Sequence, residues 1–423
     1  MHIVIIADHA FINGGQAKVA IDSAIGLAER GRRVTYFAAC GPVDPRLAAS
    51  GAEIICLDQP DITTAKSQAR FLAQTLWNTK AAHRLRELLE GLDPLTTIIH
   101  VHAWAKALSP SIGPVIRDAH IPSVYTMHEF FLVCPTGGFY DYKKAEPCTR
   151  VPLSRSCVTC NCDARSYPRK LLRIVRQLLL DNVSGMKEAI RHVITISDLQ
   201  YQVVRDYLPP GTIFHRIANP INVPDLGPKP QSGGEFLFVG RLSTEKGVAH
   251  FCEAARLAGV VPVIVGDGPL ADDLRRRYPE ARMFGWQSPQ RVRDLMRSAR
   301  ALVFPSVWYE GQPLTVYEAL ALGTPVIVSD VCAGREAIEH GINGLRFASG
   351  DPHSLAAALR SLEDDPTAER MTRAAYENYW ADPLTVDRHL DAIEALYGQL
   401  LGGISLGPHL TPESARSRAP AAV

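Results

Sequence analysis

Short apolar runs alternate with segments of helical apolar spacing along most of the chain. The first run, residues 3–7, is followed by the turn Asn13-Gly14-Gly15 and by helical spacing over residues 18–30. The next apolar run occupies residues 34–39. Because each run is apolar at consecutive positions, both faces of its strand are expected to be buried, as in a parallel sheet covered by helices.

This alternation falls into two series. The first series continues with predicted strands at residues 53–57, 97–102, 122–126 and 193–196, and with a helix at residues 81–90. The second series has predicted strands at residues 235–240, 261–265, 281–284, 301–304 and 325–328. The sequence therefore predicts an α/β protein with two lobes, residues 1–219 and 235–384, joined by a proline-rich linker at residues 220–234.

Three segments stand outside this alternation. Residues 131–168 form an insert in the first lobe that is rich in Cys, Gly and Pro. Residues 385–401 have amphipathic spacing and are expected to form a helix that packs back toward the first lobe. Residues 402–423, with Gly, Pro, Ser and Ala, are expected to be a disordered tail.

The bulk composition is that of a soluble globular protein. The chain has 423 residues, 46% hydrophobic and 21% charged, and this length suits two domains. The formal charge of +1 lacks the basic excess of a nucleic-acid binder, so no nucleic-acid partner is expected. No apolar run reaches the roughly 18 residues of a membrane span, and Met1–Asp8 has no basic leader. We therefore expect a cytoplasmic protein, in which cysteines stay reduced or bind metals.

Two cations follow the first strand of the second series, which ends in Gly240-Arg241-Leu242-Ser243-Thr244-Glu245-Lys246-Gly247. A glycine at a strand end allows a ligand to approach the backbone closely. Arg241 and Lys246 come where ligands bind in open parallel sheets. A guanidinium fork and an ammonium point charge suit a diphosphate. A solvated loop with surface charges is the alternative interpretation of this segment alone.

A second group of signals lies near residue 310. Glu310-Gly311-Gln312 follows an apolar strand and precedes a helix that opens near Pro313. The free N–H groups at such a helix start can bind phosphate. Glu310 and Glu318 can face one pocket, where their carboxylates would accept hydrogen bonds from the vicinal hydroxyls of a ribose or a hexose. An ordinary exposed pair of glutamates is the alternative.

These segments together resemble a known family. The Glu310-x7-Glu318 pattern, the Gly-Arg-Leu-x3-Lys-Gly loop and Val265-Gly266-Asp267-Gly268-Pro269 are similar to the donor lobe of the family-4 retaining glycosyltransferases, within glycosyl transferases group 1. The resemblance covers nearly the whole chain, to about residue 400. It implies the GT-B fold, in which two Rossmann-like lobes with parallel sheets face a central cleft.

The resemblance also implies roles for residues of the second lobe. Arg241 and Lys246 would bind the diphosphate of a UDP-, GDP- or ADP-sugar, Glu310 would contact the transferred sugar, and Glu318 would hold the ribose hydroxyls. The other implied donor contacts are Gly240, the amides of Leu314 and Thr315 on the phosphates, and Gly285 in Phe284-Gly285-Trp286 beside the base. The chain departs from the family at Arg335, because the family often has Pro before the residue that matches Glu336.

In the first lobe, the resemblance implies two further contacts with the donor. The strand at residues 122–126 runs into Met127-His128-Glu129, and His128 would touch the donor sugar near the scissile bond. Gly15 belongs to a turn similar to the family's glycine loop, which approaches the donor phosphates from the opposite lobe. Asn219-Pro220 is similar to an architectural turn before the linker.

The implied reaction is retaining transfer of a hexose from the nucleotide sugar to a glycan or a lipid-linked acceptor, in cell-surface polysaccharide or glycoconjugate synthesis. The acceptor hydroxyl would attack from the face of the leaving group, and the leaving phosphate would take its proton. The chain has no Asp-x-Asp pair of the metal-ligating type, so no catalytic metal is expected. Arg241, Lys246 and the helix start would stabilise the leaving diphosphate instead.

Five of the nine cysteines lie in the insert: Cys134, Cys148, Cys157, Cys160 and Cys162. Cys157-x-x-Cys160 has the spacing of zinc ligands. Cys134 and Cys148 would complete a tetrahedral site, with Cys162 as a substitute ligand. A structural zinc or iron–sulfur site and a set of free thiols are the two open interpretations.

The segment after the insert, residues 168–179, predicts an amphipathic helix. Its basic face would carry Arg169, Arg173 and Arg176, and its apolar face Leu172, Val175 and Leu179. Such a helix could rest on the anionic inner face of the cell membrane, which would carry a lipid-linked acceptor. A helix that packs on its lobe with a basic solvent face is the alternative.

Two other classes of protein would use a similar cleft. A GT-B nucleotide-sugar epimerase needs an acid–base pair in the cleft, and the sequence shows no clear one. A non-catalytic sugar-nucleotide binding protein is less favoured because Arg241, Lys246, Glu310 and Glu318 are all present. A dinucleotide dehydrogenase is disfavoured because Gly-x-Gly-x-x-Gly does not follow the first strand.

Overall fold

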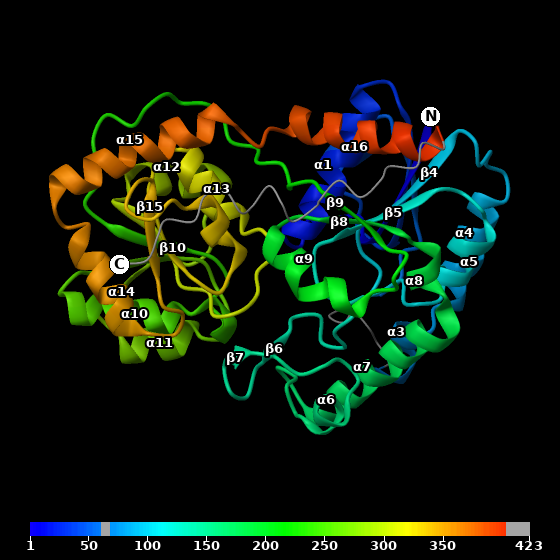
Figure 1. Ribbon diagram of the computed structural model, residues 1–423, viewed down its shortest axis with the longest axis horizontal. Helices are drawn as coiled ribbons and strands as arrows, with labels where there is room; N and C mark the ends of the chain where they lie inside the picture. The colour runs from blue at the N-terminus through cyan, green and yellow to red at the C-terminus, as the bar shows by residue number, and fades with distance from the viewer. Residues whose placement is uncertain (61–67, 403–423) are drawn as a thin grey trace.

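Two α/β lobes lie side by side in the computed structural model, which describes residues 1–60 and 68–402 (Figure 1). The first lobe is built on a parallel sheet with the strand order β3-β2-β1-β4-β5-β8-β9. Its strands are β1 (His2–His9), β2 (Arg33–Cys40), β3 (Glu53–Cys56), β4 (Thr97–Val101), β5 (Ser123–Met127), β8 (His192–Thr195) and β9 (Ile213–Arg216). Its helices are α1 (Gly15–Glu29), α2 (Pro45–Ala49), α3 (Gln68–Leu76), α4 (Thr79–Leu89), α5 (Ile112–Asp118), α8 (Met186–Ala189) and α9 (Asp198–Val204).

The central strand β1 is buried on both faces, as its continuous apolar run predicted. Val4 and Ile6 pack into a cluster with residues of α4 and α5. Ile3 and Ile5 pack into a separate cluster with residues of α1. Alternate side chains of one strand therefore serve two cores, which is the arrangement of a parallel sheet with helices on both faces.

The second lobe repeats this architecture on a smaller sheet with the strand order β12-β11-β10-β13-β14-β15. Its strands are β10 (Phe236–Val239), β11 (Pro262–Val265), β12 (Arg282–Met283), β13 (Ala301–Phe304), β14 (Val326–Ser329) and β15 (Gly344–Phe347). Its helices are α10 (Val248–Ala258), α11 (Ala271–Arg277), α12 (Pro289–Ser298), α13 (Leu314–Ala321), α14 (Pro352–Ser361) and α15 (Asp365–Ala381). The predicted α/β class with two parallel sheets is confirmed.

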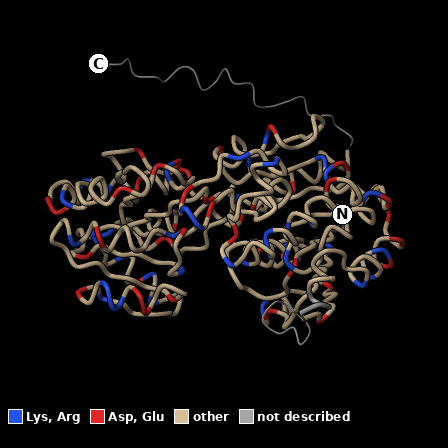
Figure 2. The backbone as a smooth tube through the Cα atoms, turned by 90° about the horizontal axis from the view of Figure 1, so that it is seen from below, with Lys and Arg blue, Asp and Glu red and all other residues tan. Residues whose placement is uncertain are grey.

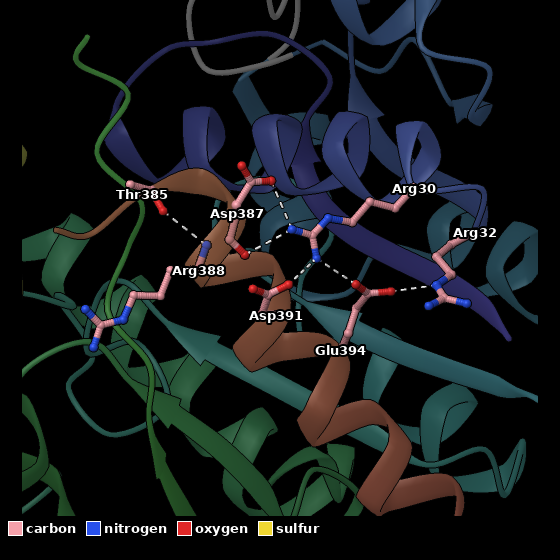
Figure 3. Close-up of polar contacts among 7 residues, drawn as sticks. All are labelled: Arg30, Arg32, Thr385, Asp387, Arg388, Asp391 and Glu394. Atoms are coloured by element: carbon pink, nitrogen blue, oxygen red, sulfur yellow. Dashed lines mark hydrogen bonds and ion pairs between the residues drawn. The ribbon is translucent and has the colours of Figure 1, made fainter. Parts of the chain in front are cut away.

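The helix α16 (Val386–Leu401) crosses back and packs on the first lobe (Figure 1). A Cβ on Gly26 of α1 would lie only 2.5 Å from Leu390 Cδ1, so a glycine there permits the close approach of α16. In the core below, the Tyr397 hydroxyl lies 2.5 Å from His100 Nδ1. At the surface, Arg30 pairs with Asp387, Asp391 and Glu394 of α16, and Arg32 also reaches Glu394 (Figure 3).

The insert extends from the first lobe, and its β6–β7 hairpin lies on the side toward the second lobe (Figure 1). It contains a short hairpin, β6 (Tyr140–Asp141) and β7 (Glu146–Pro147), and the helix α6 (Arg155–Thr159). The helix α7 (Tyr167–Leu179) follows and leads into a π-helical turn at Leu180–Ser184.

The predicted orientation of α7 is wrong. Arg176, assigned to a solvent-facing basic side, is buried and donates hydrogen bonds to the Ala105 and Pro135 carbonyl oxygens. Lys170 and Gln177 are buried on the inner side as well, and Val175 is exposed. The spacing of apolar residues predicted an amphipathic helix but not which side of it is buried. The buried side of α7 packs against carbonyl oxygens and thiols of the insert rather than against an apolar surface, so its inward residues are polar.

Three further observations concern membrane-spanning helices, the distribution of charge and the predicted tail. No helix within residues 1–60 and 68–402 is both long and apolar enough to cross a bilayer. Lys and Arg are interspersed with Asp and Glu over both lobes, in keeping with the small net charge (Figure 2). Residues 403–423, which make up nearly all of the predicted tail, lie outside the described residues.

Candidate active site

A cavity of about 230 Å³ lies between the lobes, where strands of both sheets end. Its wall includes Gly15 after β1, His128 after β5, and Glu310 and Leu314 after β13. Chain topology explains this convergence, because loops at the carboxyl ends of parallel strands share one edge of each sheet. Four of the predicted site residues, drawn from both lobes, are thus brought to one place.

Two helix N-termini meet at this cavity. α1 begins at Gly15 and α13 begins at Leu314, and neither N-cap residue supplies a side-chain hydrogen bond. A Cβ added to Gly15 would lie 3.5 Å from Leu314 Cδ1, so the two helix starts are in contact range across the cleft. Uncapped N–H groups and two converging positive dipole ends favour an anion such as a diphosphate.

Lys246 and Glu310 form an ion pair in the second lobe, with Nζ 2.5 Å from Oε1. The other carboxylate oxygen of Glu310 accepts hydrogen bonds from Ser306 Oγ and Trp308 Nε1, each at 3.2 Å. The Lys246 ammonium also lies 5.6 Å from the centre of the Trp308 ring. These contacts fix the Glu310 carboxylate and hold a cation beside the cavity.

The predicted contacts Gly240 and Gly285 lie at the ends of β10 and β12, and Gly266 lies between them at the end of β11. Gly266 N donates to the Gly285 carbonyl oxygen at 2.8 Å, and a Cβ on Gly266 would lie 1.9 Å from the Gly240 carbonyl oxygen. These loops pack so closely that a side chain at Gly266 would force them apart. Trp286, next to Gly285, is 76% exposed and offers an aromatic face at the end of β12.

Arg241, Thr315 and Glu318 lie in the second lobe outside the wall of the inter-lobe cavity. Arg241 is exposed on the loop after β10. Thr315 is half-buried in the first turn of α13, and Glu318 follows one turn later. Burial raises the pKa of Glu318, and the nearby cation Lys18 of the opposite lobe opposes this. A carboxylate on the same helix that presents the uncapped amides is suitably placed for ribose hydroxyls.

His128 is held neutral in the cavity wall. Its Nε2 lies 3.1 Å from His102 Nδ1, and the two rings are stacked. Burial, with Lys106 nearby, lowers the pKa of His128 to about 3. The imidazole is therefore uncharged near neutral pH and acts as a hydrogen-bonding group rather than as a cation.

Lys106 and Gln312 lie in the cavity wall, and the sequence analysis gave neither of them a role. Lys106 pairs with Glu129 at 3.0 Å, and the Glu129 carboxylate raises the pKa of Lys106. Gln312 links the lobes, because its Oε1 accepts from Asn219 N at 2.6 Å and its Nε2 donates to the Asn219 carbonyl oxygen. The position of Lys106 after β4 was the signal that could have found it, since ligand sites form at strand ends.

The predicted metal set Cys134, Cys148, Cys157 and Cys160 is not assembled. Cys160 Sγ lies 3.3 Å from Asp141 Oδ2 instead. Cys134, Cys148, Cys157 and the substitute Cys162 do line one small cavity, but the Lys170 ammonium shares it, 2.9 Å from Cys162 Sγ. An ammonium among the sulfur atoms repels a metal cation. Within the described part of the chain, no group of three or more His, Cys, Asp or Glu side chains is arranged to hold a metal ion.

The whole architecture matches known structures. The structure of HepE from Anabaena in complex with UDP superposes with a TM-score of 0.66 and 15% identity, over 94% of this chain and 100% of that one. Sucrose-phosphate synthase from Thermosynechococcus elongatus gives a TM-score of 0.66 and 20% identity, over 95% of this chain and 99% of that one. At these identities the likeness concerns the fold, which is GT-B.

The sequence comparisons relate the second lobe to a known family. Residues 227–378 match the family described as glycosyl transferases group 1. An Escherichia coli UDP-Gal:α-D-GlcNAc-diphosphoundecaprenol α-1,3-galactosyltransferase is 28% identical over 45% of this chain and 53% of its own length. A Mycobacterium tuberculosis glycogen synthase is 34% identical over 45% of this chain and 50% of its own length.

This chain thus spans about half of the length of these two relatives. An α-maltose-1-phosphate synthase from Mycobacterium tuberculosis is 27% identical over 66% of this chain and 73% of its own length. Through residues 227–378, the second lobe is thus similar to glycosyl transferases group 1, and this likeness covers less than half of the chain.

Proposed function

We propose that the protein is a retaining glycosyltransferase of family 4 that transfers a hexose from a nucleotide-diphosphate sugar. The observation that carries this proposal is the pair of uncapped helix starts, α1 and α13, that face each other across the cleft. They leave room for an anion beside the Lys246–Glu310 pair, and a nucleotide sugar offers a diphosphate next to a sugar.

Each site residue has a proposed role in binding this donor. Lys246, Arg241 and the amides of Leu314 and Thr315 bind the diphosphate, while Gly15 and Gly240 allow its close approach. Glu310 accepts hydrogen bonds from the transferred sugar, and Glu318 from the ribose. The base packs near Gly285 and Trp286. A UDP-sugar is the first donor to test, because the neighbour HepE is described in complex with UDP.

The reaction would be driven by stabilisation of the leaving diphosphate. The positive helix ends, Lys246 and Arg241 would stabilise the negative charge that grows on the diphosphate as its bond to the sugar breaks. Neutral His128 would position the sugar by hydrogen bonding and would not compete for the charge. The acceptor hydroxyl attacks from the face that the diphosphate leaves, and the departing phosphate oxygen takes the hydroxyl proton, so the anomeric configuration is retained.

The acceptor is proposed to be a glycan, free or lipid-linked, in cell-surface polysaccharide or glycoconjugate synthesis on the cytoplasmic side of the membrane. One relative is named for a diphosphoundecaprenol-linked acceptor and another for teichuronic acid biosynthesis. Helix α7 supports peripheral contact with an anionic membrane. Leu171, Val175 and Leu178, spaced four and three residues apart, are exposed by 39%, 44% and 45%. These residues form an outward apolar stripe.

Two basic residues lie near the start of the same helix. Arg165 is exposed and Arg169 half-buried near the start of α7, and neither forms an ion pair with the described residues. The neighbouring cations Arg169 and Arg173 help burial to lower the pKa of Arg165, which marks a local excess of positive charge. We propose that the outward apolar stripe lies in the interface of an anionic bilayer and that the positive charge near the start of α7 adds attraction to the anionic lipids.

The proposed reaction is tested by following a panel of UDP-, GDP- and ADP-sugars by NMR, with membrane extract as the source of acceptor. A transferase releases the nucleotide and forms a new glycoside with the anomeric configuration of the donor. An epimerase would instead change a sugar stereocentre with the nucleotide still attached. A binding protein would leave every donor intact, and either of these last two results would contradict the proposal.

A further inference from the structure

A second and larger cavity, of about 630 Å³, opens between the insert and the second lobe. The insert contributes Ala145, Glu146 and Pro147 of the β6–β7 hairpin, and α9 contributes Leu199. The second lobe contributes the loops after β13, β14 and β15, with Val307 and Tyr309, then Asp330, Val331 and Arg335, and Ala348 to Gly350. This volume is in the range of cavities that bind a ligand of several hundred daltons.

The order of the strands places this cavity beyond the proposed position of the transferred sugar, on the side away from the proposed base contacts. The proposed base contacts lie at the ends of β10 to β12, and Glu310 follows β13. β14 and β15 come next in the sheet, on the side away from β12. A donor that binds as proposed therefore extends from β12 to β13 and leaves the larger cavity free. Tyr309 lines both cavities, so they adjoin at the residue before Glu310.

The wall of the larger cavity has the chemistry that recognises sugars. Tyr309 supplies an aromatic face, against which the C–H groups of a pyranose ring can pack. Arg335, half-buried, donates to the Asp330 carbonyl oxygen and forms no ion pair within the described residues. The Asp330 carboxylate uses Oδ1 to accept from Ser349 N, which leaves Oδ2 for a hydroxyl. Donors and acceptors are thus mixed, as neutral hydroxyl-rich ligands require.

We propose that this cavity is a glycan subsite, which binds the sugar units of the acceptor that lie beyond the accepting one. The inference rests on the proposed function, because it assigns the smaller cavity to the donor sugar. It gives the insert a role, since the β6–β7 hairpin forms one wall of the subsite. It also gives a role to Arg335, which stands where the family often has Pro.

The test is binding of the purified full chain, with UDP present, to an array of neutral and acidic oligosaccharides. Ala348→Trp would fill the subsite, whereas Ala357→Trp adds the same ring on the exposed side of α14, away from both cavities. Arg335→Ala removes the unpaired guanidinium without adding bulk. We expect Ala357→Trp to bind the same glycans as the wild type, and Ala348→Trp and Arg335→Ala to lose about tenfold or more in affinity for them.

Two results would overturn the subsite. One is equal glycan binding by Ala348→Trp, Arg335→Ala and Ala357→Trp, and the other is no glycan binding by the wild type. Thermal stabilisation by nucleotide, measured on the same preparations, separates this failure from that of the proposed function. Retained stabilisation would limit the failure to the subsite, whereas its absence in the wild type would contradict the nucleotide-sugar site itself.

Discussion

Lys246 Nζ lies 2.5 Å from Glu310 Oε1, which joins the residue proposed for the diphosphate to the residue proposed for the transferred sugar. In a nucleotide sugar the anomeric carbon is bonded to a phosphate oxygen. A residue that binds the phosphate and a residue that binds the sugar must therefore be neighbours. The ion pair shows that Lys246 and Glu310 meet this condition. On donor binding, the phosphate would replace the carboxylate as the partner of Lys246 and leave Glu310 free to accept from sugar hydroxyls.

We predict that Glu310→Gln keeps nucleotide binding but lowers kcat/KM for transfer by about 10²- to 10³-fold, because a neutral amide loses the negative charge that holds and orients the sugar. The measurement is transfer or donor hydrolysis at fixed nucleotide occupancy. Glu363→Gln, at an exposed position of the same lobe, is the matched control and should be unaffected. Full activity in Glu310→Gln would remove Glu310 from the catalytic site.

The outward stripe of α7 predicts membrane binding that depends on side-chain polarity. Replacing Leu171, Val175 and Leu178 by Ser together should lower sedimentation with vesicles that contain phosphatidylglycerol by at least tenfold, since each serine removes apolar area from the bilayer interface. The control changes three other exposed apolar residues to Ser, namely Leu226 of the linker and Leu257 and Val261 of the second lobe. Equal loss in both triple variants, or no vesicle binding by the wild type, would contradict a specific role of α7.

The buried contact between Tyr397 of α16 and His100 of the first lobe predicts a loss of stability when the hydroxyl is removed. Tyr397→Phe removes the hydroxyl that lies 2.5 Å from His100 Nδ1 and leaves a buried polar nitrogen without that partner, so the free energy of unfolding should fall by about 1–3 kcal/mol. Urea unfolding measures this. Tyr376→Phe is the control, because its hydroxyl donates to the Asp225 carboxylate at the surface, and it should change stability by less than about 0.5 kcal/mol. Similar losses in both variants would contradict a dominant role of the buried contact.

His128 predicts a loss of stability in mild acid. Its pKa is about 3 in the folded protein and near 6.5 when unfolded, so below pH 6.5 the unfolded chain binds the extra proton and folding is penalised. Between pH 7 and pH 5 this one group should lower the free energy of unfolding by about 2 kcal/mol. Urea unfolding of His128→Gln at both pH values should show a correspondingly smaller loss. An equal loss in the variant would show that His128 does not titrate differently on unfolding.

Local sequence signals predicted the positions of several proposed donor-binding residues in the second lobe. Gly240, Lys246 and Glu310 were predictable because each lies in the segment that follows an apolar run, and strand ends of a parallel sheet converge. The edge strands β9 and β15 were not predicted, because each has four residues and an exposed arginine, Arg216 or Arg346, that interrupts the apolar pattern.

The first-lobe part of the site depends on contacts between distant segments. Lys106 and Gln312 carry no local motif, and their roles follow only from the approach of Glu129 and Asn219 in space. The inward position of Lys170 was hidden for the same reason. Spacing along α7 is compatible with either face being buried, and the thiols that surround its ammonium come from the insert.

The most direct test of the central claim is thermal unfolding of the full chain with UDP, GDP and ADP, for the wild type, Lys246→Ala and the exposed-lysine control Lys143→Ala. We predict that one nucleotide stabilises the wild type and the control, by about 2.7 kcal/mol at a concentration of 100 times its Kd, and stabilises Lys246→Ala far less. No stabilisation by any of the three nucleotides, or equal stabilisation of Lys246→Ala, would contradict a nucleotide-sugar site at the two facing helix starts.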